Sequence, residues 1–348
     1  MAVLVTGIGF VGGYIVRDLV AKGEDVVLYG FFGGSPDGTG EYPDIDNARY
    51  IVGDSGWNQV TVVVGDIRDR ELLSSTIRTH AVTGIIHLAS LVAAASELNI
   101  PRAIDVNVGG SINVFEAALA NNVERVVWAS SINVFGPRSV SAAGVIDDTS
   151  SLDPQSTYGS TKAFVEQIAR RYYLNSGLST VGLRLGKVYG FGEHVKAGRG
   201  GGNTWFVNLV ENPARGIGPS VVPFGDRSLG FHYIEDVARS FVTALESRSG
   251  SGESFVTAGD YRPIREAFEF VHKTLPEADM ELTDGGEAAG MKAGAETNWA
   301  HRYDASKAKE VLGVTPIYTM EEGLYRTISA YRKYVGLPPV QNPAATSE

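Results

Sequence analysis

The sequence contains no cysteine among its 348 residues. Disulfides, thiolate nucleophiles and cysteine-based metal sites are therefore excluded, the redox compartment is left unmarked, and we predict no metal site. Positive charge is also scarce, because 30 Lys and Arg residues stand against 40 Asp and Glu residues, for a net charge of −10. Binding to nucleic-acid phosphates requires a surplus of Lys and Arg, so we expect no nucleic-acid partner.

Long apolar segments are missing as well. No apolar run reaches the roughly 18 to 20 residues that a transmembrane helix needs, so no membrane partner is expected. The first residues, MAVLVTG, read as a strand that enters a glycine loop, and they lack a charged leader before an apolar core. We therefore expect a cytoplasmic protein without a signal peptide.

Short apolar segments alternate with amphipathic ones through the first half of the chain. The apolar segments are AVLVTG, EDVVLY, VTVVVGD, GIIHLAS, RVVWASS and TVGLRLG. Because they show no polar alternation, they are expected to be strands that are covered on both faces. This pattern is typical of a parallel sheet with crossover helices, so the sequence predicts an α/β fold with a Rossmann-type, doubly wound parallel sheet.

A glycine loop follows the first predicted strand. In VLVTGIGFVGG, the G-x-G-x-x-G pattern is formed by Gly7, Gly9 and Gly12, with Phe10 and Val11 between them. The first glycine permits a tight turn, the second lets the backbone approach a pyrophosphate, and the third lets helix and strand pack closely. The start of the helix then offers N–H groups to the anion. We predict that these five residues bind a dinucleotide.

The end of the second strand leaves the choice of dinucleotide open. It carries Gly30 and Phe31, where NAD enzymes usually place an acidic residue for the ribose and NADP enzymes an Arg for the 2′-phosphate. The segment that follows is expected to supply those contacts, together with Gly30 and Phe31. Either NAD or NADP is compatible with the sequence, and NAD is slightly preferred.

The regular alternation is interrupted twice. Residues 31–58 are rich in Gly, Asp and Pro and are predicted to form an irregular insertion. From Lys187 the alternation stops. Residues 1–186 are therefore predicted to form the NAD(P)-binding domain, and residues 187–338 mainly a smaller C-terminal substrate-binding lobe, with some segments returning to the sheet. Residues 339–348 are expected to be a disordered tail.

Catalytic candidates lie at the end of RVVWASS and in YGSTK. Ser130 and Ser131 end a strand at the edge where parallel sheets bind ligands, and both are expected to face the site. Tyr158 and Lys162 stand one helical turn apart. A nearby ammonium favours the phenolate of a tyrosine, whose ordinary pKa is about 10, and Ser131 can orient a substrate hydroxyl. An isolated Tyr-x-x-x-Lys string is more often a surface feature, so the pattern alone does not decide.

Ordered motifs over nearly the whole chain resemble the extended short-chain dehydrogenase/reductase family, which includes the nucleotide-sugar epimerases and dehydratases. The motifs are TGIGFVG, GDIRD, HLAS, NVGGSINVFEAA, SSINVFG, YGSTK, LRLGKVYGFG, FHYIEDVA and YDASKAKEVLGVTP. The resemblance implies an enzyme that acts on a small molecule with NAD(P) as cofactor. It implies that Ser131, Tyr158 and Lys162 form a catalytic triad.

The resemblance also implies further cofactor contacts and an assembly. Asp66 is expected to meet the adenine amino group, Ile67 to pack on the adenine ring, and Lys162 to hold the nicotinamide ribose beside Tyr158. The remaining cofactor candidates are Leu88, Ala89, Ser90, Asn107 and Val188, and Asn107 also supports the strand edges. The helix with YGSTK usually packs against its copy, so a homodimer is expected.

The substrate positions depart from those of nucleotide-sugar enzymes. Such enzymes usually carry Asn at the position of Lys187 and Arg at the position of Leu229, and loss of that Arg removes a phosphate clamp. The two carboxylates of the sugar dehydratases are replaced by Ile132 and Asn133, which disfavours a dehydratase. AGRGGGN, residues 197–203, is expected to be a substrate lid. The weak substrate candidates are Asn133, Lys187, His194, Trp205, Leu229 and His232.

Three functions are compatible with these observations. The first is an NAD(P)-dependent oxidoreductase that acts at a secondary alcohol or ketone of a sugar-like or other hydroxylated substrate. The second is a nucleotide-sugar 4-epimerase with tightly bound NAD. The third is a non-catalytic dinucleotide-binding regulatory protein, which the intact Ser-Tyr-Lys set disfavours.

Overall fold

The structure is a computed structural model that describes residues 1–31, 43–198, 205–286 and 300–344. Its centre is a seven-stranded, wholly parallel sheet with the order β11-β7-β5-β4-β1-β2-β3. The strands are β1 (Ala2–Thr6), β2 (Asp25–Gly30), β3 (Val60–Val64), β4 (Gly84–His87), β5 (Arg125–Ser131), β7 (Ser179–Leu185) and β11 (Glu253–Thr257). The strand order reverses direction at β1, as in a Rossmann sheet, so the predicted fold class is confirmed.

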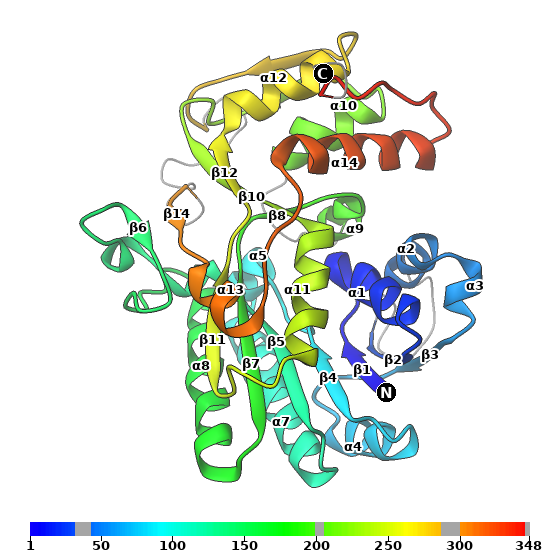
Figure 1. Cartoon of the computed structure of the whole chain (residues 1–348), viewed down its shortest axis with the longest axis vertical. Helices are drawn as coiled ribbons and strands as arrows, with labels where there is room; N and C mark the ends of the chain where they lie inside the picture. The colour runs from blue at the N-terminus through cyan, green and yellow to red at the C-terminus, as the bar shows by residue number, and fades with distance from the viewer. Residues whose placement is uncertain (32–42, 199–204, 287–299, 345–348) are drawn as a thin grey trace.

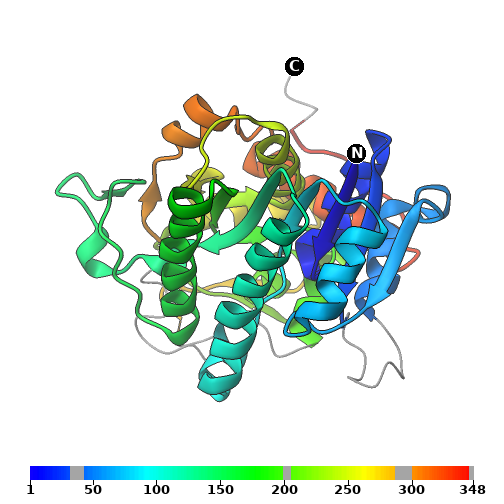
Figure 2. The same cartoon turned by 90° about the horizontal axis from the view of Figure 1, so that it is seen from below.

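Helices cover both faces of this sheet. On one face lie α1 (Gly9–Ala21) and α11 (Ile234–Glu246), and on the other lie α4 (Arg70–Thr79), α7 (Gly110–Ala120) and α8 (Thr157–Ser176) (Figures 1 and 2). Alternate residues of one strand enter different cores: Val3 and Val5 pack in the first, and Leu4 packs in the second. This alternation explains why the strands read as uninterrupted apolar runs.

Strand β3 is an exception to the expectation that the apolar strands are covered on both faces. Val62 and Val64 are 36% and 40% exposed. The prediction was wrong here because β3 is the edge of the sheet and pairs only with β2 in the described part of the chain.

The segment 31–58 is more regular than predicted. Residues 43–57 form α2 (Pro43–Val52) and α3 (Asp54–Trp57), and residues 32–42 lie outside the described residues. Proline at the first position and the acidic residues Asp44 and Asp46 in the first turn are ordinary signals of a helix start. Ala48 of α2 is fully buried against α1, so this helix belongs to the core of the domain.

Short strands and helices, most of them from the second half of the chain, lie beyond the carboxyl ends of the central strands (Figure 1). A three-stranded sheet has the order β12-β10-β8, and the pairs β13-β9 and β14-β6 are two-stranded. These elements are β6 (Val145–Ile146), β8 (Val188–Tyr189), β9 (Ser220–Val222), β10 (Ser228–Tyr233), β12 (Asp260–Pro263), β13 (Met280–Leu282) and β14 (Arg302–Tyr303). The helices there are α9 (Glu193–Gly198), α10 (Asn212–Ala214), α12 (Ile264–Thr274) and α14 (Met320–Tyr334), whereas α13 (Ser306–Leu312) packs beside β11.

Two statements about this half of the chain, the domain boundary and the disordered tail, remain predictions. Strand β11 lies in the central sheet although it follows residue 187, but the domain boundary at residues 186 and 187 stays a prediction. So does the disordered tail: residues 345–348 lie outside the described residues, and residues 339–344 contain no helix or strand. None of the described helices is both long enough and apolar enough to span a membrane.

Candidate active site

The three predicted catalytic residues lie together at the carboxyl edge of β5. Ser131 is the last residue of that strand, and its hydroxyl lies close enough to the phenol of Tyr158, in the first turn of α8, to lower the pKa of that phenol. The Lys162 ammonium lies 5.5 Å from the centre of the Tyr158 ring and donates to the carbonyl of Ala129 at 2.8 Å. The sequence prediction therefore names residues that the fold brings into contact.

The start of α8 is fixed by contacts that place Tyr158 beside Ser131. The Ser156 hydroxyl accepts from the backbone N–H of Gly159, and the carboxylate of Glu97 accepts from both the N–H and the hydroxyl of Thr157. Gly159 lies so close to the turn after Ser131 that a Cβ on it would stand 2.1 Å from the Asn133 carbonyl oxygen. The glycine of YGSTK therefore allows the close approach, a role that the sequence analysis missed.

Burial shifts the pKa values of Lys162 and Tyr158 in this site. The pKa of Lys162 falls to about 8 because its ammonium is buried. The pKa of Tyr158 rises to about 12 through burial, although the hydrogen bond with Ser131 lowers it in part. The expected lowering of the Tyr158 pKa by Lys162 is thus not seen in this state. The reason is that the ammonium is directed at the Ala129 carbonyl while the phenol loses its hydration.

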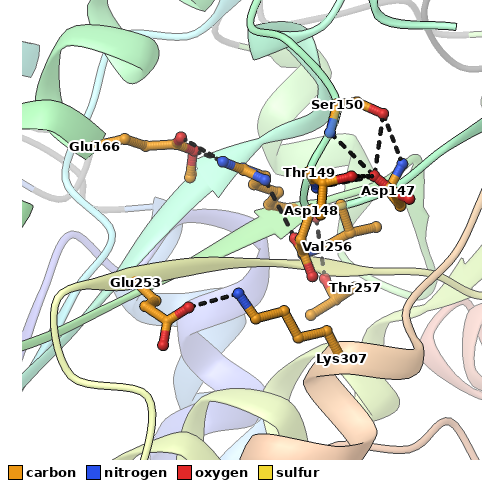
Figure 3. A network of polar contacts seen from close by, with 11 residues as sticks. Asp147, Asp148, Thr149, Ser150, Glu166, Glu253, Val256, Thr257 and Lys307 are labelled. Atoms are coloured by element: carbon orange, nitrogen blue, oxygen red, sulfur yellow. Dashed lines mark hydrogen bonds and ion pairs between the residues drawn. The ribbon is translucent and has the colours of Figure 1, made fainter.

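The expectation that Ser130 faces the site was wrong, because successive residues of a strand point to opposite faces. The Ser130 hydroxyl donates to Glu166 of α8 at 2.6 Å. Arg184 of β7 binds the two oxygens of that carboxylate at 2.9 and 2.8 Å and also contacts Asp148 at 3.1 Å, which accepts from the N–H of Val256 (Figure 3). This buried network joins α8, β7, β11 and the loop before α8.

A second polar chain runs through His87, at the end of β4. Its Nδ1 lies 2.6 Å from the Thr6 hydroxyl and its Nε2 lies 3.0 Å from the Ser111 hydroxyl, which donates to the Asn107 carbonyl. Ser111 must then accept, so we assign the proton of the imidazole to Nε2. Burial lowers the His87 pKa to about 3, and the imidazole is therefore neutral.

Asn107 lies in a π-helical turn, Ile104–Gly109, that precedes α7. Its side chain accepts from the Leu91 N–H at 2.7 Å and donates to the Leu91 carbonyl at 2.9 Å and to the Thr161 hydroxyl at 3.1 Å. The Thr161 hydroxyl donates to the Tyr158 carbonyl. These bonds tie the chain after β4 to α8, in agreement with the expected support of the strand edges.

The glycine loop has the shape that a dinucleotide phosphate requires. Gly7 and Gly9 have φ angles of +71° and +40°, and helix α1 begins after Ile8 without a side-chain cap. A Cβ on Gly7 would stand 2.7 Å from the Ala89 backbone, which follows β4. Gly12 is buried in α1 against Ile8. These residues fit the predicted cofactor, because no side chain caps the start of the helix and its first turn can present backbone N–H groups to an anion.

The other cofactor candidates border the carboxyl edge of the same strands. Gly30 ends β2 and Phe31 follows it, Leu88, Ala89 and Ser90 follow β4, and Val188 begins β8. The carboxylate of Asp66 is held by Arg68, whose hydrogen bonds lower its pKa although burial raises it. Ile67 is buried against Gly110, and Phe10 is buried in the core, while Val11 is half-buried.

The weak substrate candidates are scattered. Leu229 is 1% exposed and Trp205 is 3% exposed, and both belong to the core, with Trp205 stacked on Phe206. His194 packs against three aromatic rings, those of Phe191, Tyr331 and Tyr334. Asn133 lies in the turn after Ser131. Lys187 and His232 lie near a pocket beyond this edge, and residues 199–203 of the expected lid lie outside the described residues.

Replacing Gly7 with alanine is expected to destabilise the protein by more than about 1 to 2 kcal/mol, because a left-handed backbone carries that cost for a residue with a Cβ. The predicted clash with Ala89 should also lower dinucleotide affinity. Urea unfolding and a fluorescence titration with NAD measure the two effects. Gly23→Ala is the matched control, since Gly23 has a φ of +79° but nothing within 4 Å of its Cβ position. An equal loss of NAD affinity in both variants would contradict this role of Gly7.

The family model for the NAD dependent epimerase/dehydratase family matches residues 3–258. The chain belongs to this family. Members of the family are enzymes, so the predictions of an enzyme and of an extended short-chain dehydrogenase/reductase are confirmed. The match includes the glycine loop, the three predicted catalytic residues and the seven central strands.

Individual relatives in the epimerase/dehydratase family are distant. UDP-glucuronate 4-epimerase 1 of Arabidopsis thaliana is 28% identical over 353 residues, which cover 97% of this chain and 78% of the relative. UDP-glucose 4-epimerase of Thermotoga maritima, solved with UDP-glucose, has a TM-score of 0.75 at 22% identity and covers 96% of this chain and 100% of its own. The Thermus thermophilus UDP-glucose 4-epimerase, solved with NAD, has a TM-score of 0.72 at 24% identity, with 95% and 99% covered. The solved structures share this fold.

Proposed function

We propose that this member of the family is an NAD(P)-dependent oxidoreductase that acts at a secondary alcohol or ketone of a sugar-like or other hydroxylated small molecule. The observation that supports this proposal is the contact between Ser131 and Tyr158 beside the buried ammonium of Lys162. In oxidation Tyr158 removes the hydroxyl proton of the substrate, and in reduction it returns one. Ser131 orients the reacting oxygen and stabilises charge that develops on it.

The cofactor that this proposal requires is NAD or NADP, with NAD slightly preferred. When bound, the nicotinamide accepts or supplies the hydride. The loop at Gly7 and Gly9 would hold the pyrophosphate, and Lys162 would hold the nicotinamide ribose. The NAD complex of the Thermus thermophilus UDP-glucose 4-epimerase supports the preference for NAD.

The second candidate is a nucleotide-sugar 4-epimerase with tightly bound NAD, in which the same triad oxidises and then reduces one carbon. The names of the relatives, UDP-glucuronate and UDP-glucose 4-epimerases, favour this function. Such an enzyme needs cations for the diphosphate of its substrate.

The described cations near the position of Leu229 argue against a diphosphate site. Arg262, which pairs with Leu229 in the neighbouring strand, is bound by Glu266 and Glu321. Arg227 and Arg265 form ion pairs with Asp226 and Asp284. A guanidinium that already binds carboxylates has less charge to offer to a phosphate, so we rank the oxidoreductase first.

One experiment separates the candidate functions. Purified protein is incubated with NAD or NADP and with free sugars, sugar acids or UDP-sugars, while the absorbance of reduced nicotinamide is followed. Reduction of added cofactor by a free substrate supports the oxidoreductase. Interconversion of a UDP-sugar by protein that retains NAD through purification, without net reduction, supports the epimerase. Tight cofactor binding without turnover of any compound supports the regulatory protein.

We also propose that the protein is a homodimer that pairs through α8. Exposed apolar residues gather on α5 (Ala93–Leu98), α6 (Ile100–Ala103), the π-helical turn and α8, which contact one another. They include Leu98, Ile100, Ile104 and Phe164, and Leu98 is 87% exposed. An apolar patch of this kind favours a partner surface.

Replacing Phe164 with glutamate is expected to convert the dimer to a monomer, because the charge would be buried in the apolar interface. Light scattering after gel filtration measures the mass. Ile317→Glu is the control, since Ile317 is 62% exposed and lies outside these helices. A wild-type monomer at all concentrations would refute the dimer.

A further inference from the structure

A buried chain of hydrogen bonds starts at the glycine loop, and His87 is its centre. Thr6 is the last residue of β1, directly precedes Gly7 and is fully buried. Its hydroxyl donates to Nδ1 of His87 at 2.6 Å, because the imidazole proton is on Nε2. Nε2 in turn donates to the hydroxyl of Ser111 at 3.0 Å. The imidazole at the end of β4 therefore joins the end of β1 to the first turn of α7.

The chain continues from α7 to the start of α8. Ser111 donates to the Asn107 carbonyl at 2.6 Å, and the Asn107 amide donates to the Thr161 hydroxyl at 3.1 Å. That hydroxyl donates to the carbonyl of Tyr158 at 2.8 Å. The side chains of Ser111, Asn107 and Thr161 belong to residues that are at most 4% exposed. Because buried hydrogen bonds are costly to break, a displacement at one end of the chain displaces the next residue with it.

The segment that follows β4 is held between the same two ends. The backbone of Ala89 lies against Gly7, 2.7 Å from the position that a Cβ on that glycine would occupy. The backbone N–H and carbonyl of Leu91 both bond to the side-chain amide of Asn107. The predicted cofactor contacts at residues 88–90 lie within this segment. The segment and the chain through His87 thus connect the two ends of the predicted dinucleotide site.

The charge of His87 matters because Lys162 is close to it. Burial and, to a smaller extent, the positive charge of Lys162 lower the His87 pKa to about 3. The imidazole is therefore neutral at physiological pH, and its Nδ1 can accept from Thr6. A neutral ring keeps the chain intact without adding a second cation near Lys162, whose own pKa is lowered by burial.

We propose that His87 is a positioning residue that holds the glycine loop and Tyr158 in fixed relation to each other. The two ends of a bound dinucleotide are then aligned with the phenol. The Nδ1 side of the ring positions the loop through Thr6, and the Nε2 side positions Tyr158 through Ser111 and Asn107. Because the two roles belong to different ring nitrogens, substitution can separate them. This inference rests on the proposed function, in which Tyr158 is the acid and base.

Two amide substitutions each keep one half of the chain. In His87→Asn the side-chain oxygen takes the place of Nδ1 and can accept from Thr6, but the contact with Ser111 is lost. In His87→Gln the side-chain nitrogen takes the place of Nε2 and can donate to Ser111, but the contact with Thr6 is lost. Both variants bury one amide, so the general cost of the substitution is matched between them.

His87→Gln is expected to weaken NAD binding roughly threefold to tenfold, as loss of one buried hydrogen bond allows, while kcat at saturating NAD stays nearly unchanged. His87→Asn is expected to lower kcat by a similar factor with NAD affinity nearly unchanged, because a misaligned Tyr158 slows the reaction without weakening the cofactor contacts. A fluorescence titration with NAD and initial rates at saturating NAD measure the two quantities. Equal losses in both variants, or no loss in either, would overturn the positioning role.

Smaller changes at the neighbours repeat the test if a His87 variant does not fold. Thr6→Val should weaken NAD binding as His87→Gln does, and Ser111→Ala should lower kcat as His87→Asn does. A double variant with Thr6→Val and His87→Gln should lose no more NAD affinity than either single variant, since both changes break the same hydrogen bond. Additive losses of affinity would contradict the chain.

Amide hydrogen exchange distinguishes failure of this inference from failure of the proposed function. NAD binding should slow exchange at the start of α8, residues 157–162, and this protection should be smaller in Ser111→Ala. Wild-type protein that shows this coupled protection but turns over no substrate would contradict the oxidoreductase and support the role of His87. Turnover that neither His87→Asn nor Ser111→Ala changes would contradict the role of His87 alone.

Discussion

Replacing Tyr158 with phenylalanine is expected to lower kcat by roughly 10² to 10⁴-fold, the usual contribution of a positioned acid or base. The variant removes only the phenol oxygen that lies near Ser131 and keeps the ring beside Lys162. Cofactor affinity should therefore stay close to that of the wild type. Stopped-flow measurement of nicotinamide reduction, together with a binding titration, separates the two quantities.

Tyr172→Phe is the matched control for this prediction. Tyr172 lies on the same helix and its hydroxyl donates to Glu116 at 2.7 Å, but it is distant in sequence from the first turn of α8. Loss of that hydroxyl should leave kcat nearly unchanged. If Tyr158→Phe retained full activity, Tyr158 could not be the acid or base, whatever substrate is used.

Much of the fold could be predicted because its signals are local. A strand buried on both faces must be apolar throughout, and the six apolar segments all became strands of the central sheet. Helix α2 was missed although its start signals are present, because the Gly and Pro around residues 31–42 dominated the composition of the segment. The exposure of β3 was not predictable, since the position of a strand in the sheet depends on pairings that periodicity does not encode.

The triad could be predicted from motifs, but its surroundings could not. The contacts of Ser130 depend on Glu166 and Arg184, which come from two other elements. A single sequence does not reveal such pairs. His194 and Trp205 illustrate the opposite error: their residue types suggest a ligand site, yet their rings pack in aromatic clusters. Polar or aromatic character alone cannot tell a core position from a pocket.

Replacing Arg184 with methionine is expected to lower the free energy of unfolding by about 3 to 5 kcal/mol, the usual effect of breaking a buried ion pair. Arg184 is buried and binds the carboxylates of Glu166 and Asp148 (Figure 3). Methionine fills a similar volume but leaves both carboxylates buried without a cation. Chemical unfolding measures the change. Because Glu166 lies one helical turn after Lys162, we also expect kcat to fall.

Arg49→Met is the control, since the ion pair of Arg49 with Asp54 is exposed and should contribute little. An Arg184→Met effect no larger than that of the control would refute the role of the buried network.

The pH dependence of the Arg184→Met effect follows from Asp148, whose pKa burial already raises in the wild type, although Val256 and Arg184 partly oppose this. Without Arg184 the folded-state pKa should rise further above the unfolded value. Between the unfolded and the folded pKa of Asp148, the folded variant holds a proton that the unfolded chain has released. Above the folded pKa both states are deprotonated, and the destabilisation is complete. It should become smaller as the pH falls through that pKa toward the ordinary value. A destabilisation that stays constant from neutral to acidic pH would mean that the cost comes from lost packing and not from the uncompensated carboxylates.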